Sequence, residues 1–164
     1  MNYGGRLISS YVCDSRVADE EFILTKSEYE YLTGRSQRKN EVIAYHIRQS
    51  FKPDEVDAET ANRIGYELAM SFTKGKHAFV VATHTDRKHI HNHIVFNSTN
   101  INCDGKFNNY WRTDKVIRRI SDLLCLENGL SVIENPQPSI YFITLGHLSA
   151  LSKTSSNNCL RKSM

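Results

Sequence analysis

Hydrophobic and polar side chains alternate strictly over residues 89–98, which is the clearest pattern in the chain. An alternation with a period of two is typical of a β-strand that buries one face. Residues 76–84 are rich in β-forming side chains, and the polar residues 85–88 join the two segments. We therefore predict an antiparallel β-hairpin. One face of its second strand carries His89, His91, His93, Val95 and Asn97, and the other carries Ile90, Asn92, Ile94 and Phe96.

The length of the connection also predicts how the two strands pair. A loop of four residues would place His84 opposite His89. Side chains that face each other across neighbouring strands have Cβ atoms about 4.5–5.5 Å apart. We therefore expect His84 to join the face that carries the other histidines.

Three helices are predicted from apolar side chains spaced three and four residues apart. They span residues 19–33, 57–73 and 113–128. Asp57 is a favourable N-cap for the second helix, and Gly34 ends the first. The expected buried side chains are Phe22, Ile23, Tyr29 and Leu32 in the first helix, Ala61, Ile64, Gly65, Leu68, Ala69 and Phe72 in the second, and Val116, Ile117, Ile120, Leu123 and Leu124 in the third.

A further strand is predicted over residues 41–51, where apolar side chains alternate with a polar side formed by His46, Arg48 and Ser50. Short strands are also predicted over residues 6–12 and 130–134. Helices and an antiparallel sheet that share one core form an α+β domain. We expect the helices to pack on one face of that sheet.

The C-terminal part of the chain differs from the rest in composition. It contains two prolines, many Ser and Asn residues and one apolar patch, residues 140–145. We expect one domain over residues 1–134 and a tail of uncertain order over residues 135–164.

The charge of the chain does not by itself indicate a nucleic-acid partner. The 164 residues carry 21 Lys and Arg against 18 Asp and Glu, a net charge of +3. Positive and negative side chains cancel over residues 1–134, and the whole excess lies in the tail. No apolar run approaches the roughly 18 residues of a membrane span, and the N-terminus lacks a leader pattern, so we expect a cytoplasmic protein with no membrane segment. The four cysteines have no metal-binding or disulfide spacing, and we expect reduced thiols.

The histidines carry the candidate chemistry. Neutral imidazole is the commonest metal-binding side chain, and three imidazoles on a rigid strand pair leave a coordination position open, as in catalytic metal sites. Asp86 lies between His84 and His89 and is placed to orient a ligand through a hydrogen bond. The competing interpretation is a polar strand face on which four histidines gather by coincidence. We favour the metal site.

The segment from His84 to Asn97 resembles the three-histidine motif of relaxases, the mobilisation nucleases of the MobA/VirD type within the HUH endonuclease superfamily. The resemblance extends from the start of the chain to about Glu134. It is supported by the stretches Gly4–Tyr11, Leu32–Arg35, Val42–Phe51 and Phe107–Arg112. It implies a palm-like α+β fold of that superfamily.

The resemblance also implies an activity. A tyrosine would attack a phosphodiester of single-stranded DNA at an origin of transfer, form a 5′-phosphotyrosine and release a 3′-hydroxyl. The family pattern makes His84, His91 and His93 the metal ligands, while His89 is either a ligand or a contact to phosphate or tyrosine. Asp86 would orient a ligand histidine through a hydrogen bond without binding the metal itself. Mg²⁺ or Mn²⁺ suits a site completed by phosphate oxygens, whereas three imidazoles alone favour Zn²⁺.

In relatives of this type the nucleophile lies before the Gly-Gly-Arg-Leu stretch, which is where this chain begins. We therefore expect a truncated nuclease domain that lacks its N-terminal segment. Tyr3 and Tyr11 are the nearest tyrosines, and a turn residue and a packing residue are the simpler interpretations of them.

Residues that would contact DNA are suggested by position and by the family stretches. Arg87 and Lys88 adjoin the histidines. The other candidates are His46, Arg48, Gln49, Ser50 and Asn97. The alternative for these side chains is plain exposure to solvent. The partners that the resemblance implies are single-stranded DNA at the origin of transfer and accessory mobilisation proteins.

Three functions remain open at this point. The first is the DNA strand transferase, and the second is a DNA-binding remnant without a nucleophile. The third is a metallohydrolase that uses water, which requires a carboxylate base near the metal, and Asp86 is the nearest. Detection of a covalent protein–DNA product distinguishes the first from the other two.

Overall fold

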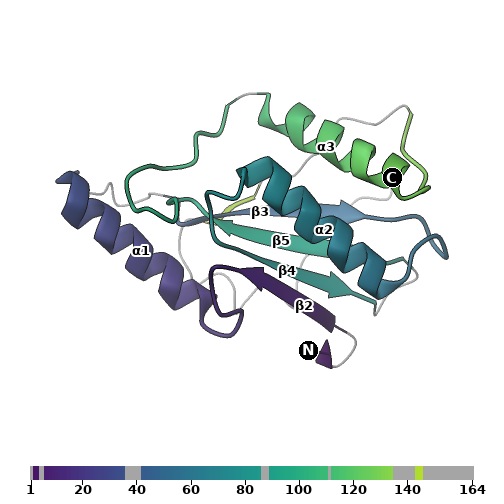
Figure 1. The fold of residues 1–164 in the computed structure, drawn as a ribbon, viewed down its shortest axis with the longest axis horizontal. Helices are drawn as coiled ribbons and strands as arrows, with labels where there is room; N and C mark the ends of the chain where they lie inside the picture. The colour runs from purple at the N-terminus through teal and green to yellow at the C-terminus, as the bar shows by residue number, and fades with distance from the viewer. Residues whose placement is uncertain are drawn as a thin grey trace, which may run out of the picture.

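A computed structural model describes residues 2–3, 6–35, 42–85, 89–110, 112–134 and 143–145. In this part of the chain, three helices accompany an antiparallel sheet whose six strands run in the order β1-β2-β4-β5-β3-β6 (Figure 1). The elements are β1 Asn2–Tyr3, β2 Arg6–Tyr11, α1 Ala18–Thr33, β3 Ala44–Ser50, α2 Ala58–Thr73, β4 Phe79–His84, β5 His91–Asn97, α3 Thr113–Glu127 and β6 Ile143–Leu145. The α+β fold predicted from the sequence is confirmed.

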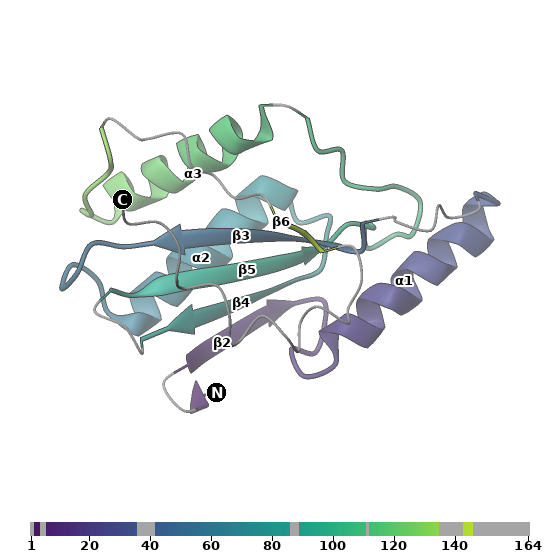
Figure 2. The ribbon, with the colours of Figure 1, turned by 180° about the vertical axis from the view of Figure 1, so that it is seen from behind.

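Helix α2 covers one face of the sheet and α3 packs beside α2, and Figure 2 shows the opposite face, with α2 behind the strands. The core lies between α2 and the central strands. Its fully buried members are Ile64 and Leu68 from α2, Phe79 and Val81 from β4, and Ile94 and Phe96 from β5. Strands β4 and β5 therefore turn alternate side chains to the helices, and the remaining side chains face the other way.

The ends of the helices follow local chemistry. The Asp57 carboxylate accepts a hydrogen bond of 2.9 Å from the backbone N–H of Thr60, which caps the start of α2. Gly34 ends α1 with φ +65° and donates its N–H to the carbonyl of Glu30. Both predicted helix boundaries are confirmed.

Helix α1 lies at one end of the sheet, and few of its side chains are buried (Figure 1). Its buried side chains are Phe22, Lys26 and Tyr29, and Phe22 packs with Ala44 and Ala78. The expected burial of other apolar helix residues was wrong. The exposed ones are Ile23 (44%) and Leu32 (64%) in α1 and Val116 (51%) and Leu123 (52%) in α3. These apolar side chains of α1 and α3 are therefore not part of the core formed by the described residues.

The pairing of the histidine hairpin also differs from the expectation. Strand β5 begins at His91, so the connection spans residues 85–90, and His84 pairs with His91 instead of His89. Residues 130–134 form no strand. Residues Ile143–Leu145 form β6, which pairs with Ala44–His46 of β3 at the edge of the sheet. Residues 135–142 and 146–164 lie outside the described residues.

Two smaller expectations concern cysteines and membranes. Cys13, Cys103 and Cys125 are free thiols, and Cys159 lies outside the described residues. Among the helices of the described chain, none has the length and apolar character needed to cross a bilayer.

Candidate metal centre

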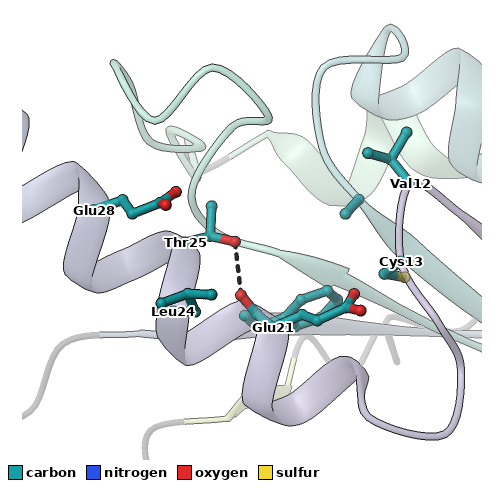
Figure 3. A pocket seen from close by; sticks show the side chains of 8 residues that line it. Val12, Cys13, Glu21, Leu24, Thr25 and Glu28 are labelled. Atoms are coloured by element: carbon teal, nitrogen blue, oxygen red, sulfur yellow. Dashed lines mark hydrogen bonds between the residues drawn. The ribbon is translucent and has the colours of Figure 1, made fainter.

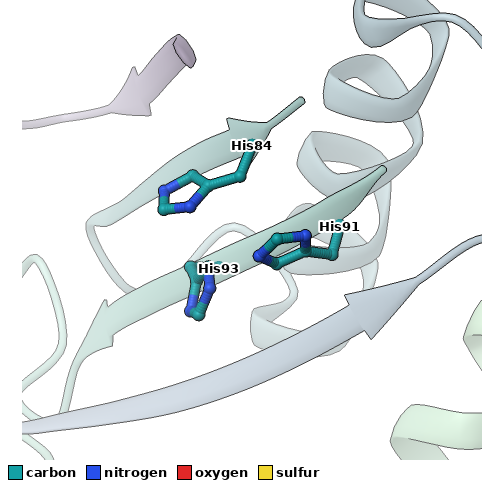
Figure 4. A group of neighbouring side chains, drawn as sticks. All are labelled: His84, His91 and His93. Atoms are coloured by element: carbon teal, nitrogen blue, oxygen red, sulfur yellow. The ribbon is translucent and has the colours of Figure 1, made fainter. Parts of the chain in front are cut away.

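Three imidazoles converge on the face of the sheet opposite α2 and α3. His84 pairs with His91, and Ala82 pairs with His93, so the strand period turns all three histidines to the same side. Figure 4 shows them pointing toward one another from β4 and β5. One ring nitrogen from each lies within 4.8 Å of the others. The ring centroids are 4.8 Å apart for His84 and His93, and 5.1 Å for the other two pairs.

This donor set fits a divalent cation. Metal–nitrogen bonds to histidine are about 2.0–2.1 Å long for zinc, and three such donors leave at least one position for water or a substrate oxygen. The strands supply a rigid support, since every residue of β4 is paired with β5. His91 is 4% exposed, so the site is partly withdrawn from solvent.

The protonation state of His93 and of its neighbour His46 also favours metal binding. Burial, and next the charges of His46, His84 and His91, lower the pKa of His93 to about 3. Burial likewise lowers the pKa of His46, with a smaller effect from Arg48. These imidazoles are therefore neutral at pH 7, and their lone pairs are available without the release of a proton.

A buried polar network lies directly behind the histidines, on the helix side of the sheet. Asn92, between His91 and His93 in sequence, is fully buried. It donates to the carbonyl of Ala61 (2.6 Å) and to Gln49 Oε1 (3.0 Å) and accepts from the Thr83 hydroxyl (2.7 Å). The Asn62 amide donates in turn to the Thr83 hydroxyl at 2.9 Å. The network ties β3, β4 and β5 to α2.

Sequence reasoning missed this network. Its signal was Asn92 itself, the single polar side chain on a strand face that otherwise carries Ile90, Ile94 and Phe96. Gly65 of α2 makes room for it, because a Cβ atom there would lie 2.5 Å from Asn92 Nδ2. Residue 65 must therefore lack a side chain for Asn92 to reach the helix backbone.

The structure brings some of the predicted site residues together. Arg48 pairs with His93 and Ser50 pairs with His91, so both exposed side chains lie on the histidine face. His46 lies on the same face and contacts His93. His89 lies outside β5, and its ring centroid is 5.8 Å from that of His91. It is not part of the converging group found among the described residues.

Other predicted residues lie elsewhere. Gln49 is 6% exposed and faces the helices, where its amide donates to Ser121 Oγ at 2.9 Å. Asn97 is 1% exposed, and its side-chain oxygen accepts the backbone N–H of Thr99. Neither side chain is available to DNA, because burial and internal hydrogen bonds occupy both. Asp86, Arg87 and Lys88 lie outside the described residues.

The two candidate tyrosines differ in position. Tyr11 pairs with Phe79 at the far end of β2, where its ring stacks on Phe79 at 5.3 Å. The Tyr3 backbone pairs with Arg6, which pairs with His84. Residues 6 and 11 are five positions apart, which is roughly 17 Å along a strand. Position 3, unlike position 11, therefore lies in the cross-strand row of His84 and His91.

A pocket of about 430 Å³ lies away from the histidines, between α1 and the segment that follows β2 (Figure 3). Its acidic side chains hold the local structure. Glu21 accepts the backbone N–H of Asp14 at 3.2 Å, and Glu28 accepts the Cys103 thiol at 3.2 Å. Burial, assisted by Glu21, raises the pKa of Cys13 to about 11, so this thiol is a poor nucleophile. The pocket offers no chemistry comparable with the histidine cluster.

Comparison with known proteins agrees with this geometry. A family model described as relaxase, MobA/VirD2-like, nuclease domain, matches residues 3–130. A protein rlx of Staphylococcus aureus is 35% identical over 149 residues, which cover 91% of this chain and 44% of rlx. The group II intron-interrupted relaxase LtrB of Lactococcus lactis subsp. cremoris is 35% identical over 114 residues, which cover 60% of this chain and 20% of LtrB. The chain thus spans less than half the length of either relative. No solved structure matches it.

Proposed function

The chain belongs to the MobA/VirD2-like relaxases, and from this we propose that it nicks single-stranded DNA at an origin of transfer with the help of a divalent metal. The observation that carries the proposal is the convergence of His84, His91 and His93 from two paired strands. The neighbouring positions Ala82 and Val95 on this face carry apolar side chains, which bind neither metal nor phosphate. The three imidazoles are therefore the metal-binding groups of this face.

The chain's own residues would divide the work as follows. His84, His91 and His93 hold the metal, which when bound polarises the scissile phosphate as a Lewis acid. Arg48 and Ser50 are exposed beside the two β5 histidines, and they orient the DNA backbone through its phosphates. Arg87 and Lys88, which adjoin the motif in sequence, would add positive charge.

The identity of the metal depends on the ligand atoms that surround it. Three imidazoles by themselves favour Zn²⁺ or another late transition metal. A phosphate oxygen and water in the remaining positions make the site suitable for Mg²⁺ or Mn²⁺. We propose Mg²⁺ or Mn²⁺ as the working metal, with Zn²⁺ as the alternative that a metal-dependence series would detect.

We further propose tyrosine chemistry for the nicking step. The tyrosine hydroxyl gives up its proton as its oxygen bonds to phosphorus, the bond from phosphorus to the 3′-oxygen breaks, and the released 3′-oxygen takes up a proton. Of the two tyrosines considered, Tyr3 is the better placed in register, and Tyr11 is held at the other end of β2 by Phe79. Accessory mobilisation proteins would act with the relaxase at the origin.

The test is incubation of the protein with a randomised pool of single-stranded oligonucleotides and Mn²⁺ or Mg²⁺. The products are analysed for cleavage and for covalent protein–DNA adducts by mass spectrometry. We expect cleavage with an adduct on tyrosine, which would overturn the sequence-based expectation of a missing nucleophile, and loss of both in His93→Ala and in the presence of a chelator. His77→Asn is the matched control, because His77 Nδ1 contacts the carbonyl of Asn97 at 2.9 Å at the other end of β5.

Each alternative has its own result. Cleavage without an adduct would indicate a water-using metallohydrolase. Binding without cleavage, also when a tyrosine-bearing segment is added upstream, would indicate a DNA-binding remnant. Tyr3→Phe compared with Tyr11→Phe tests the position of the nucleophile, and an adduct that survives Tyr3→Phe would exclude Tyr3.

A further inference from the structure

One contact of the histidine face is not explained by metal ligation or by DNA binding. His46 Nε2 and His93 Nδ1 are 2.8 Å apart. The two rings are inclined by 6° and their centroids are 4.9 Å apart. Nitrogens this close in rings this far apart require the rings to meet edge to edge in nearly one plane. The contact is therefore an in-plane hydrogen bond and not ring stacking.

The sheet makes this contact possible. His46 of β3 pairs with Val95, and His93 is two residues before Val95 in β5. The two histidines are thus diagonal neighbours on one face, a separation that long and aromatic side chains can bridge. Both rings are half-buried, which shields the hydrogen bond from competing water.

The hydrogen bond determines which nitrogen of His93 remains for a metal. A neutral imidazole has one N–H donor and one acceptor nitrogen. If a metal takes the lone pair of His93 Nε2, its Nδ1 carries the proton and must donate to His46 Nε2. His46 then carries its own proton on Nδ1. A metal-bound histidine typically donates its second N–H to such an acceptor, and this fixes its ring orientation.

We propose that His46 is a positioning residue, which accepts a hydrogen bond from His93 Nδ1–H and holds His93 Nε2 toward the metal. His46 is not a fourth ligand, because its Nε2 is engaged with His93 Nδ1 and because the converging group among the described residues consists of His84, His91 and His93. The inference rests on the proposed metal-dependent function and assigns the part of one residue within it. It replaces the expected contact between His46 and DNA.

The test compares side chains at position 46 that differ in reach. In His46→Gln the amide oxygen can occupy the place of Nε2, whereas His46→Asn is too short and His46→Phe has no acceptor. His77→Asn removes one histidine outside the cluster and serves as the control. The dissociation constant of Zn²⁺ is measured by chelator competition with each folded protein, and urea unfolding of the metal-free proteins checks that each variant folds.

We expect His46→Phe and His46→Asn to bind Zn²⁺ about 10–100-fold more weakly than the wild type, as is usual when a partner of a ligand histidine is lost. His46→Gln should recover most of the affinity, and His77→Asn should match the wild type. In the Zn²⁺-loaded wild type, ¹⁵N NMR of the histidines should show His93 protonated on Nδ1.

Two failures can be told apart. If the wild type binds Zn²⁺ and the Phe and Asn variants bind it equally well, the role of His46 is overturned and the proposed function stands. The role of His46 is likewise overturned if His93 is protonated on Nε2. If the wild type binds neither Zn²⁺ nor Mn²⁺, the metal-dependent function and the role of His46 fall together. Should His46→Phe not fold, the comparison of Gln with Asn decides alone.

Discussion

Replacing Asn92 by Asp would convert the polar network behind the histidines into a conflict of charge with almost no change in shape. The Asn92 amide nitrogen now donates to the carbonyl of Ala61 and to Gln49 Oε1. In the variant an oxygen would face both acceptors. An ionised carboxylate would retain only the hydrogen bond from Thr83, since the side-chain oxygen already accepts there, and a protonated carboxyl could donate to one of the two acceptors. Because the site is fully buried, water cannot compensate.

The size of the effect follows from the proton that the native state must hold. An aspartate in the unfolded chain has an ordinary pKa of about 3.9, whereas a buried carboxyl among acceptors stays protonated at pH 7. At pH 7, which is about 3.1 units above the pKa of the unfolded aspartate, folding must take up a proton. This costs about 4 kcal/mol at about 1.36 kcal/mol per pH unit. One of the two carbonyl acceptors also loses its donor, which adds about 1–3 kcal/mol.

The assay is urea unfolding of Asn92→Asp and the wild type between pH 7.5 and pH 4.5. We expect a loss of about 5 kcal/mol or more at pH 7, a large share of a typical domain stability of 5–15 kcal/mol. The loss should shrink by roughly 3 kcal/mol at pH 4.5, because this pH lies only about 0.6 units above the pKa of the unfolded aspartate and the proton is taken up at much lower cost. Asn109→Asp, at an exposed position, is the matched control and should be neutral. A loss below about 1 kcal/mol, or one that does not change with pH, would refute the account of the network.

Three further predictions concern the same region. Zn²⁺ at 100 times its dissociation constant should stabilise the wild type by about 2.7 kcal/mol in a thermal melt and leave His84→Ala unchanged, and an equal shift in both would argue against the three-histidine site. In chelator, the free energy of unfolding should fall as pH drops below about 6.5, because burial lowers the pKa of His93 to about 3 and the unfolded chain takes up protons that the native state does not. Urea titrations check this, and His93→Gln should flatten the profile. Gly65→Ala should cost about 1–3 kcal/mol in urea unfolding, because the new Cβ would lie 2.5 Å from Asn92 Nδ2. Ser71→Ala, on the exposed side of α2, is the neutral comparison.

Local pattern determined much of this protein. The period of two over residues 89–98 indicated a strand with histidines on one face, and that face is the one the structure shows. The capping residue Asp57 and the terminating Gly34 marked helix ends, because both act through hydrogen bonds or dihedral angles within a few residues. The family motif in the same hairpin indicated the relaxase family, and the family comparison confirmed that the chain belongs to it.

Contacts between distant segments could only be decided by the tertiary structure. The period of two specifies the face of a histidine but not its partner, so a connection two residues longer paired His84 with His91 in place of His89. The hydrogen bond between His46 and His93 spans 47 residues of sequence, and no local pattern records it. Burial of Asn92 became understandable only once Gly65 of α2 lay against it. The alternation of side chains along a strand is a local property of the backbone. The contact partner of each side chain depends on which distant segments come together when the sheet and helices pack.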